Sequence, residues 1–143
     1  MKKGIILGLI FAAFTVFSTK AQDCDSIYRV VESYLVTSDD GRSFVSDGQV
    51  YTAFLDNEKA EFNTTLYGNT VYRIAASAGI KDDYAIFTIK DMEDNILFTN
   101  KDQLNSPYWD FKVQNSIPVK VQTELDTNKK ITGCIVMMIG FLK

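Results

Sequence analysis

Carboxylates are the side chains of this sequence with the greatest capacity for chemistry. They gather in three stretches that are typical of turns: residues 39–40, residues 82–83, and the cluster Asp91, Glu93, Asp94 and Asn95. Calcium prefers several oxygen ligands that converge from a loop, so the third cluster is a weak calcium candidate. Its spacing is not that of an EF-hand, and acidic turn residues are usually solvated. A carboxylate pair could also serve a glycosidase, which we rank below calcium.

Histidine is absent from the whole sequence. This excludes Ser-His-Asp and Cys-His catalysis, acid–base chemistry by histidine, and histidine-ligated zinc, copper or haem. Two cysteines alone do not form a structural zinc site, and the sequence contains no glycine-rich phosphate loop. We therefore expect no enzymatic activity and no cofactor, with calcium at the acidic turn as the one candidate.

Aromatic side chains offer a second chemistry, the stacking of sugar rings. Tyr108 and Trp109 follow the longest unpatterned stretch, residues 100–107, and form a weak candidate ligand site. Trp109 is in phase with Phe111 and Val113 at a period of two, which favours a place in the core. Tyr108 is out of phase with them and is the residue that we expect to be exposed.

Cys24 and Cys134 are the only cysteines in the sequence. In an exported protein an even number of cysteines suggests a disulfide, which here would join the start of the mature chain to its last strand. The chain-entropy model assigns such a long loop about 4 to 5 kcal/mol of stabilisation. The alternative is that Cys134 is a buried free thiol. We favour the disulfide.

Residues 1–21 have the three parts of a secretory signal peptide. Lys2 and Lys3 precede an apolar run over residues 5–17, and Ala21 supplies a small residue for cleavage. The run is about 13 residues, shorter than the roughly 20 that span a bilayer, which favours cleavage over a retained anchor. Acylation of Cys24 is disfavoured because residues 20–23 do not form a lipobox. We expect a periplasmic or secreted protein of a Gram-negative bacterium, with residues 22–143 as one domain and no membrane span after signal cleavage.

The predicted mature chain is acidic. Removal of Lys2, Lys3 and Lys20 leaves 12 of the 15 basic residues against 18 acidic ones, a net charge of −6. Its densest basic pair is Lys129 and Lys130. A chain of this charge is not a general binder of nucleic acid or of anionic membranes. We expect no nucleic-acid partner.

Hydrophobic periodicity predicts one helix and eight strands. Apolar residues at helical spacing place a helix at residues 25–36. Residues 61–79 are predicted as two strands joined in a tight hairpin at residues 67–70, because Gly68 and Asn69 tolerate positive φ. Residues 84–90 and 131–142 are apolar on both faces and are predicted as central strands. The other strands are predicted at residues 49–55, 96–99, 108–113 and 119–125, with a turn at residues 46–48 before the first.

About eight strands with frequent turns predict an antiparallel β-sandwich or jelly roll that carries one short N-terminal helix. Three stretches add a resemblance: Gly-Asn-Thr-Val-Tyr-Arg-Ile at 68–74, Tyr-Ala-Ile-Phe-Thr-Ile-Lys-Asp at 84–91 with Asn-Ile-Leu-Phe at 95–98, and Pro-Val-Lys-Val at 118–121. With these, residues 49–142 resemble the bacterial pre-peptidase C-terminal domain and related jelly rolls. The sequence departs from that family at residues 115–117, where a glycine is usual. Residues 133–141 also resemble small exported proteins of Gram-negative bacteria.

The resemblance implies a non-catalytic accessory domain that aids secretion, folding or substrate contact. Together with the missing catalytic groups, it leads us to expect a non-enzymatic binding or accessory module of the bacterial envelope or the extracellular space. Its partner would be an envelope protein or a polysaccharide. The alternative is a carbohydrate-binding or calcium-stabilised adhesion module.

Overall fold

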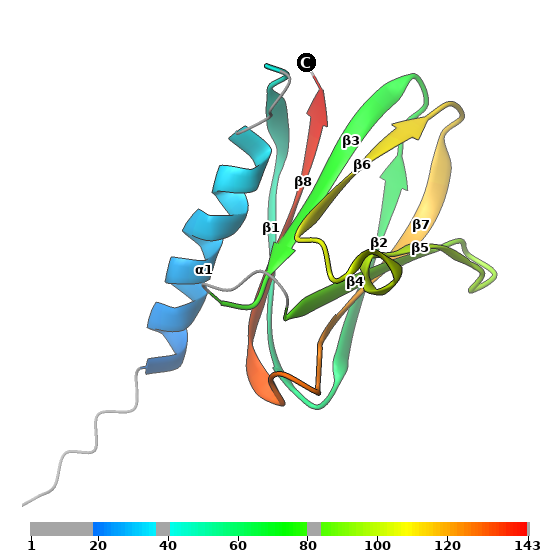
Figure 1. The fold of residues 1–143 in the computed structure, drawn as a ribbon. Helices are drawn as coiled ribbons and strands as arrows, with labels where there is room; N and C mark the ends of the chain where they lie inside the picture. Colours follow the sequence, from blue (N-terminus) through cyan, green and yellow to red (C-terminus); the bar gives the residue numbers. More distant parts are fainter. Residues whose placement is uncertain (1–18, 37–40, 80–83, 143) are drawn as a thin grey trace, which may run out of the picture.

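The computed structural model describes residues 19–36, 41–79 and 84–142. Within them, eight strands form two four-stranded antiparallel sheets that face each other as a sandwich (Figure 1). The first sheet has the order β1 (Phe44–Asp56), β8 (Thr132–Leu142), β3 (Thr70–Ser77) and β6 (Tyr108–Val113). The second has the order β2 (Lys59–Leu66), β7 (Ile117–Leu125), β4 (Ala85–Lys90) and β5 (Ile96–Thr99).

The strand pairs are nested along the chain. β1 pairs with β8, β2 with β7, β3 with β6, and β4 with β5. The chain therefore runs out and back as one long double ribbon, which is rolled so that alternate pairs lie in opposite sheets. This arrangement is a jelly roll. The predicted fold class is confirmed, including the number of strands and the two central strands, β4 and β8.

The two strands predicted at residues 61–79 both exist, but they do not pair with each other. β2 pairs with β7, whereas β3 pairs with β6 and β8, so the turn between them carries the chain from one sheet to the other. Asn69 has a φ of 57°, but Gly68 provides space: a Cβ at this position would lie 2.6 Å from the backbone oxygen of Gln114. The hairpin prediction is wrong because turn residues favour a chain reversal without specifying the partner strand.

The main core lies between the two sheets. Inward side chains alternate along the strands, as Ile135, Met137 and Ile139 do on β8. They meet Phe87 and Ile89 of β4 from the opposite sheet. Each such side chain, when fully buried, contributes about 1.5 to 3 kcal/mol relative to an exposed one.

The outer face of the first sheet has a second core beneath helix α1 (Thr19–Val36) (Figure 1). Ile27, Val31 and Leu35 of the helix pack on the other face of β8 and β3, where Val136 and Ala75 lie. This explains why β3 and β8 are apolar on both faces. None of the helices among the described residues is long and apolar enough to cross a lipid bilayer.

The helix ends at the predicted residue, but it begins at Thr19 rather than Asp25. The predicted signal peptide lies outside the described residues, except for residues 19–21. The predicted disulfide is confirmed: Cys24 of α1 is bonded to Cys134 of β8, with the two Cα atoms 5.6 Å apart. The sulfur of Cys24 is therefore engaged in a bond within the chain.

Residues 46–48 do not form the predicted turn before a strand. β1 already begins at Phe44, and its pairing with β8 shifts between Ser46 and Val50, which makes this segment a bulge within the strand. Gly48 has a φ of 88°, a conformation that glycine adopts at little cost. The alternation of residues 49–55 correctly predicted a strand. It did not predict that the strand continues through the bulge to Phe44.

Candidate functional site

The predicted calcium cluster forms the turn between β4 and β5, and the side chains of Asp91, Asp94 and Asn95 bind within the chain. Oδ1 of Asp91 accepts hydrogen bonds from the backbone N–H groups of Glu93 and Asn95, both at 2.9 Å. Oδ2 of Asp91 accepts one from Nδ2 of Asn95, also at 2.9 Å. Nζ of Lys120 lies 2.9 Å from Oδ1 of Asp94. Asp91 is therefore a turn-stabilising residue, and calcium binding here stays a prediction.

These bonds shift the pKa values of Asp91 and Lys120. The hydrogen bond from the Asn95 side chain, followed by the backbone bonds, holds the pKa of Asp91 below its ordinary value. The hydrogen bond to Asp94 raises the pKa of Lys120. Among the described residues, no three cysteine or carboxylate side chains are grouped as a metal site would require. The acidic pairs at residues 39–40 and 82–83 lie outside those residues.

Tyr108 and Trp109 lie on opposite faces of β6, so they do not form one site. Tyr108 faces the helix and is half-buried, with its ring 5.7 Å from that of Tyr34. Its predicted exposure is wrong because α1 covers this face of the sheet. Trp109 faces the other side as predicted and stacks on Phe98 at 5.4 Å. It nevertheless stays 37% exposed, because β6 is the edge of its sheet.

A charged cluster lies buried beneath α1, centred on Arg73. Nε and Nη2 of Arg73 donate to the two carboxylate oxygens of Asp110 at 2.7 and 3.0 Å, and Nη1 donates to the backbone oxygen of Tyr34 at 2.9 Å. The guanidinium lies 4.2 Å from the ring of Phe44 and 4.4 Å from that of Tyr108. Its donors are directed at protein acceptors, so the cluster fastens the end of the helix to the sheet.

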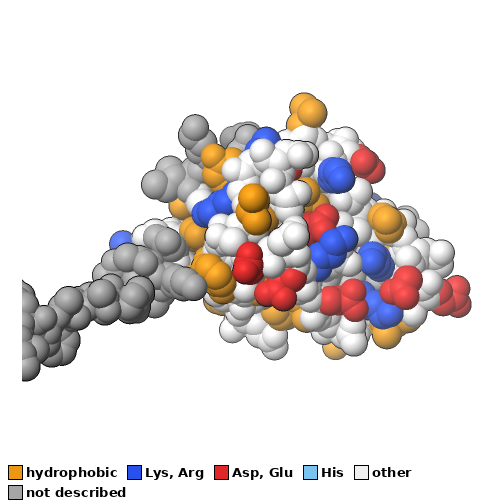
Figure 2. All heavy atoms as spheres, turned by 90° about the horizontal axis from the view of Figure 1, so that it is seen from below, with side chains coloured by type: hydrophobic (Ala, Val, Ile, Leu, Met, Phe, Trp, Pro, Cys, Tyr) orange, Lys and Arg blue, Asp and Glu red, His pale blue; other side chains and the backbone are white. Residues whose placement is uncertain are grey.

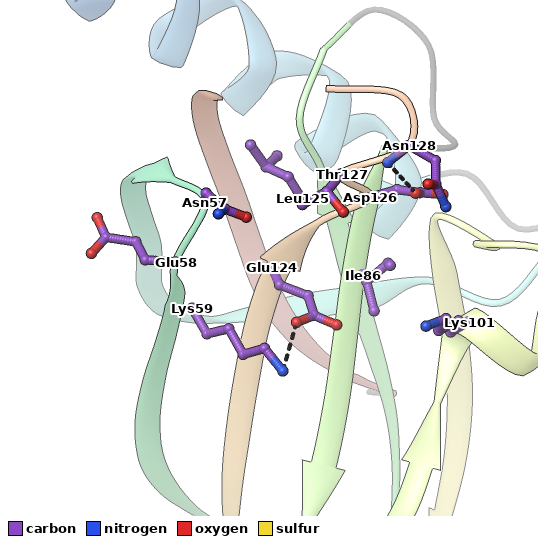
Figure 3. A pocket seen from close by; sticks show the side chains of 10 residues that line it. All are labelled: Asn57, Glu58, Lys59, Ile86, Lys101, Glu124, Leu125, Asp126, Thr127 and Asn128. Carbon is purple, nitrogen blue, oxygen red and sulfur yellow. Dashed lines mark hydrogen bonds and ion pairs between the residues drawn. The ribbon is translucent and has the colours of Figure 1, made fainter. Parts of the chain in front are cut away.

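A polar depression of about 370 Å³ lies at one end of the second sheet (Figure 3). Its floor includes Ile86 of β4, and the side chains of Lys59 and Glu124 form an ion pair of 3.0 Å in its wall. Figure 3 shows that the carboxylate of Glu58 points away from the centre. Lys101 reaches the opposite rim from the 3-10 helix η1 (Asn100–Gln103). Lys59 and Glu124 thus balance each other's charge, and the carboxylate of Glu58 is directed outward.

The surface around this end of the sandwich also lacks a broad area of one charge. Figure 2, which views the molecule from the bottom of Figure 1, shows acidic and basic side chains interspersed among the described residues. Hydrophobic side chains on this face form small, separate areas. A strongly charged polymer would find no continuous complement on the part of this face that the structure describes.

A larger cleft, of about 490 Å³, opens between the two sheets beside the β1 bulge. Its apolar inner wall consists of Leu66, Tyr72, Ile139 and Phe141. Its polar rim consists of Asp47, Gln49, Asn63, Thr64, Thr65 and Thr70, together with the hydroxyl of Tyr51. An apolar pocket with a few converging polar groups is the usual form of a ligand site. Bulges are also frequent next to such sites.

Tyr51 and Tyr67 contribute to the cleft in different ways. Tyr67 is 63% exposed at the rim, and its backbone N–H donates to the hydroxyl of Tyr72 at 2.9 Å. Tyr51 stacks on Phe62 at 3.8 Å across the gap between the sheets, and its hydroxyl donates to Oε1 of Gln49 at 2.8 Å. The ring of Tyr67 is therefore accessible, whereas that of Tyr51 forms part of the wall.

Asp47 is the carboxylate at the mouth of this cleft. Partial desolvation raises its pKa, and the hydrogen bond from the Gln49 backbone N–H, at 2.9 Å, opposes that rise. Desolvation, followed by the charge of Asp47, raises the pKa of Tyr51, which keeps the phenol neutral. The sequence pattern did not indicate these residues, because Ser46, Asp47 and Gly48 are typical of a turn. A bulge glycine inside a longer alternating pattern was the signal that could have identified them.

The fold and these clefts define an eight-stranded jelly-roll β-sandwich with a disulfide-linked helix on one face. The sequence matches no model of a known protein family and no curated protein, so the resemblance to the pre-peptidase C-terminal domain rests on the stretches quoted above. Among solved structures, the fold is similar to that of Aeromonas hydrophila PliG, a periplasmic lysozyme inhibitor of g-type lysozyme. The TM-score is 0.49 at 7% sequence identity, covering 74% of this chain and 92% of that chain.

Proposed function

We propose that this protein is an exported, non-enzymatic binding module whose cleft beside the β1 bulge takes a saccharide of the bacterial envelope. The observation that carries the proposal is the exposed ring of Tyr67 next to a polar rim over an apolar wall. Sugar rings present C–H groups to aromatic faces and hydroxyl groups to amides and carboxylates. Gln49 and Asn63 supply the amides, and Asp47 supplies the carboxylate.

The chemistry of the cleft supports binding without catalysis. Asp47 is the one carboxylate among the described residues that line it, whereas glycoside hydrolysis in most families uses two. The absence of histidine removes the other common acid–base group. The disulfide between Cys24 and Cys134 supports an exported location, because such bonds persist in oxidising compartments.

A glycan array followed by calorimetry with the strongest ligand tests this proposal. The Tyr67→Ala variant should weaken binding about tenfold, since aromatic stacking is worth on the order of 1 kcal/mol. Its backbone bond to Tyr72 does not need the side chain, so the fold should persist. The matched control is Trp109→Ala, which removes an exposed ring from the opposite edge of the sheet and should leave affinity unchanged. If Trp109→Ala weakens binding and Tyr67→Ala does not, the result would exclude the cleft and favour the site predicted at Trp109.

A further inference from the structure

The sandwich has four edge strands, and β2 and β6 are the two that pair continuously along their full length, over more than four residues. β1 is interrupted by its bulge, β5 has four residues, and β2 presents the charged side chains of Lys59 and Glu61 to solvent. β6 has six residues, continuous pairing with β3 and no proline, and its two charged residues, Asp110 and Lys112, have opposite signs. Proteins normally blunt free edges with bulges, short strands, prolines or charges, because an open edge pairs readily with another strand. α1 packs mainly on β8, β3 and β1, and on β6 it contacts Tyr108 through the ring of Tyr34.

The side chains along this edge are largely apolar. Trp109 and Phe111 of β6 contact the ring of Phe98 of β5 at 5.4 and 4.9 Å, and these rings close the gap between the two sheets. Next to them, Ile96 and Leu97 of β5 are at least half exposed. A hollow of about 260 Å³ lies behind the rings, with Leu97 and Phe111 among its lining residues. β6 thus has a neighbouring strand on one side only and lies beside an exposed apolar surface.

The sequence of β6 is complementary to itself in an antiparallel register. Centred on Phe111, a second copy would place its Lys112 opposite Asp110, and its Asp110 opposite Lys112. Trp109 would face Val113 of the second copy, on the same side of the sheet as the two Phe111 rings. Lys112 is exposed, and among the described residues it forms no ion pair. Asp110 is held by Arg73 and also lies 3.9 Å from Nη2 of Arg42, but its side chain stays 27% exposed, and a carboxylate can accept further bonds.

We propose that a second copy of this chain binds at this edge, β6 against β6, which joins the two first sheets into one eight-stranded sheet. The self-complementary charges favour a second copy over an extended segment of another protein, which would need its own acidic residue opposite Lys112. The contact is isologous and therefore closed, so it yields a dimer without further growth. It uses the opposite edge of the sandwich from the saccharide cleft, so the two proposals are independent.

Sedimentation velocity of the folded, disulfide-bonded protein tests the dimer between about 10 and 300 µM, the range of a modest interface. The wild type should become dimeric across this range. Lys112→Glu should weaken dimerisation at least tenfold, because two acidic pairs would face each other, and Lys112→Arg should preserve it. Lys101→Glu is the matched control, since it makes the same charge change on an exposed lysine away from β6. A wild type that stays monomeric at every concentration would overturn the proposal, and so would a dimer that Lys112→Glu does not weaken. If the monomer instead binds an added peptide, detected by a change in Trp109 fluorescence, the edge binds a segment of another protein and the proposal is also wrong.

Cross-linking tests the register. Opposite residues of an antiparallel pair have Cα atoms about 4.5 to 5.5 Å apart, within reach of a disulfide. Phe111→Cys should therefore cross-link to itself under mild oxidation. Gln114→Cys should not, because the two copies of residue 114 would be roughly 20 Å apart at 3.3 Å per residue. Circular dichroism checks that each variant is folded. Cross-linking at residue 114 in place of 111 would contradict the proposed register.

Discussion

At the scale of single residues, a side-chain amide replaces a missing strand partner. β5 pairs with β4 only from Thr88 onward, so the preceding part of that β4 edge lacks a neighbouring strand. The buried side chain of Asn100 fills this position: Oδ1 accepts from the Phe87 N–H at 2.9 Å, and Nδ2 donates to the oxygens of Ala85 at 2.9 Å and Ser106 at 3.0 Å. One amide thus satisfies three backbone groups, two of them through buried hydrogen bonds.

The Asn100→Ala variant should lower the free energy of unfolding by about 3 kcal/mol, because each buried group left without a partner costs about 1 to 3 kcal/mol. Urea unfolding measures the change. Asn115→Ala provides the control, since that side chain is exposed in a turn and should change stability by less than about 0.5 kcal/mol. Equal effects of the two substitutions would show that Asn100 does not act as a strand partner.

Asp91 leads to a pH-dependent prediction. Its pKa is lowered in the folded state, chiefly by the hydrogen bond from the Asn95 side chain, so its contribution to stability is present above the ordinary pKa. That contribution is lost as the pH falls through the lowered pKa. Asp91→Asn should therefore destabilise the protein more at about pH 6.5 than at about pH 3, which lies below the ordinary pKa of an aspartate. Urea unfolding at both pH values measures this, and a constant difference between the proteins would contradict the assignment.

At the scale of elements, the sequence specifies strands better than their partners or their exposure. The alternation in residues 61–79 correctly placed β2 and β3, but Gly68 is required by the close approach of Gln114, a residue distant in the sequence. The phase of Trp109 was correct, yet its exposure depends on β6 being an edge. Tyr108 was misjudged because the covering helix comes from the other end of the chain. Each error concerns a contact that local periodicity does not contain.

Helix α1 is fastened at both ends, and this gives a prediction for the element. Cys24 holds its first half through the disulfide, and Arg73 holds its last turn through the oxygen of Tyr34. The disulfide closes a separation of 110 residues, so Cys24→Ser combined with Cys134→Ala should cost up to about 4 kcal/mol. Hydrogen exchange should quicken most in the first half of the helix.

Arg73→Lys is the matched comparison, because lysine cannot make the same set of directed bonds. Hydrogen exchange in this variant should instead quicken in the last turn of α1, while thiol titration of the unfolded, unreduced protein still finds no free thiol. Uniform loosening of the whole helix in both variants would show that the two attachments act as one.

At the scale of the whole molecule, the nested pairing implies an order of folding. β4 and β5 are separated by the turn at residues 91–95, whereas β3 and β6 are separated by the whole β4–β5 unit and η1. Closing a longer loop costs more entropy before any contact stabilises it. A jelly roll rich in such distant pairs should therefore fold slowly, on a scale of milliseconds to seconds, beginning with the innermost pair.

Two matched isoleucines of the main core test this order. Ile89 lies in β4 and Ile74 in β3, both buried between the sheets, and Ile→Val should cost each about 1 kcal/mol. If β4 and β5 pair first, Ile89→Val should mainly slow folding, with a φ-value above about 0.5, whereas Ile74→Val should mainly speed unfolding, with a value below about 0.3. Stopped-flow kinetics with the disulfide intact separates these rates. The two substitutions delete the same methyl group from the same core and differ chiefly in whether their strand belongs to the innermost pair. Equal or reversed φ-values would therefore show that folding does not begin with β4 and β5.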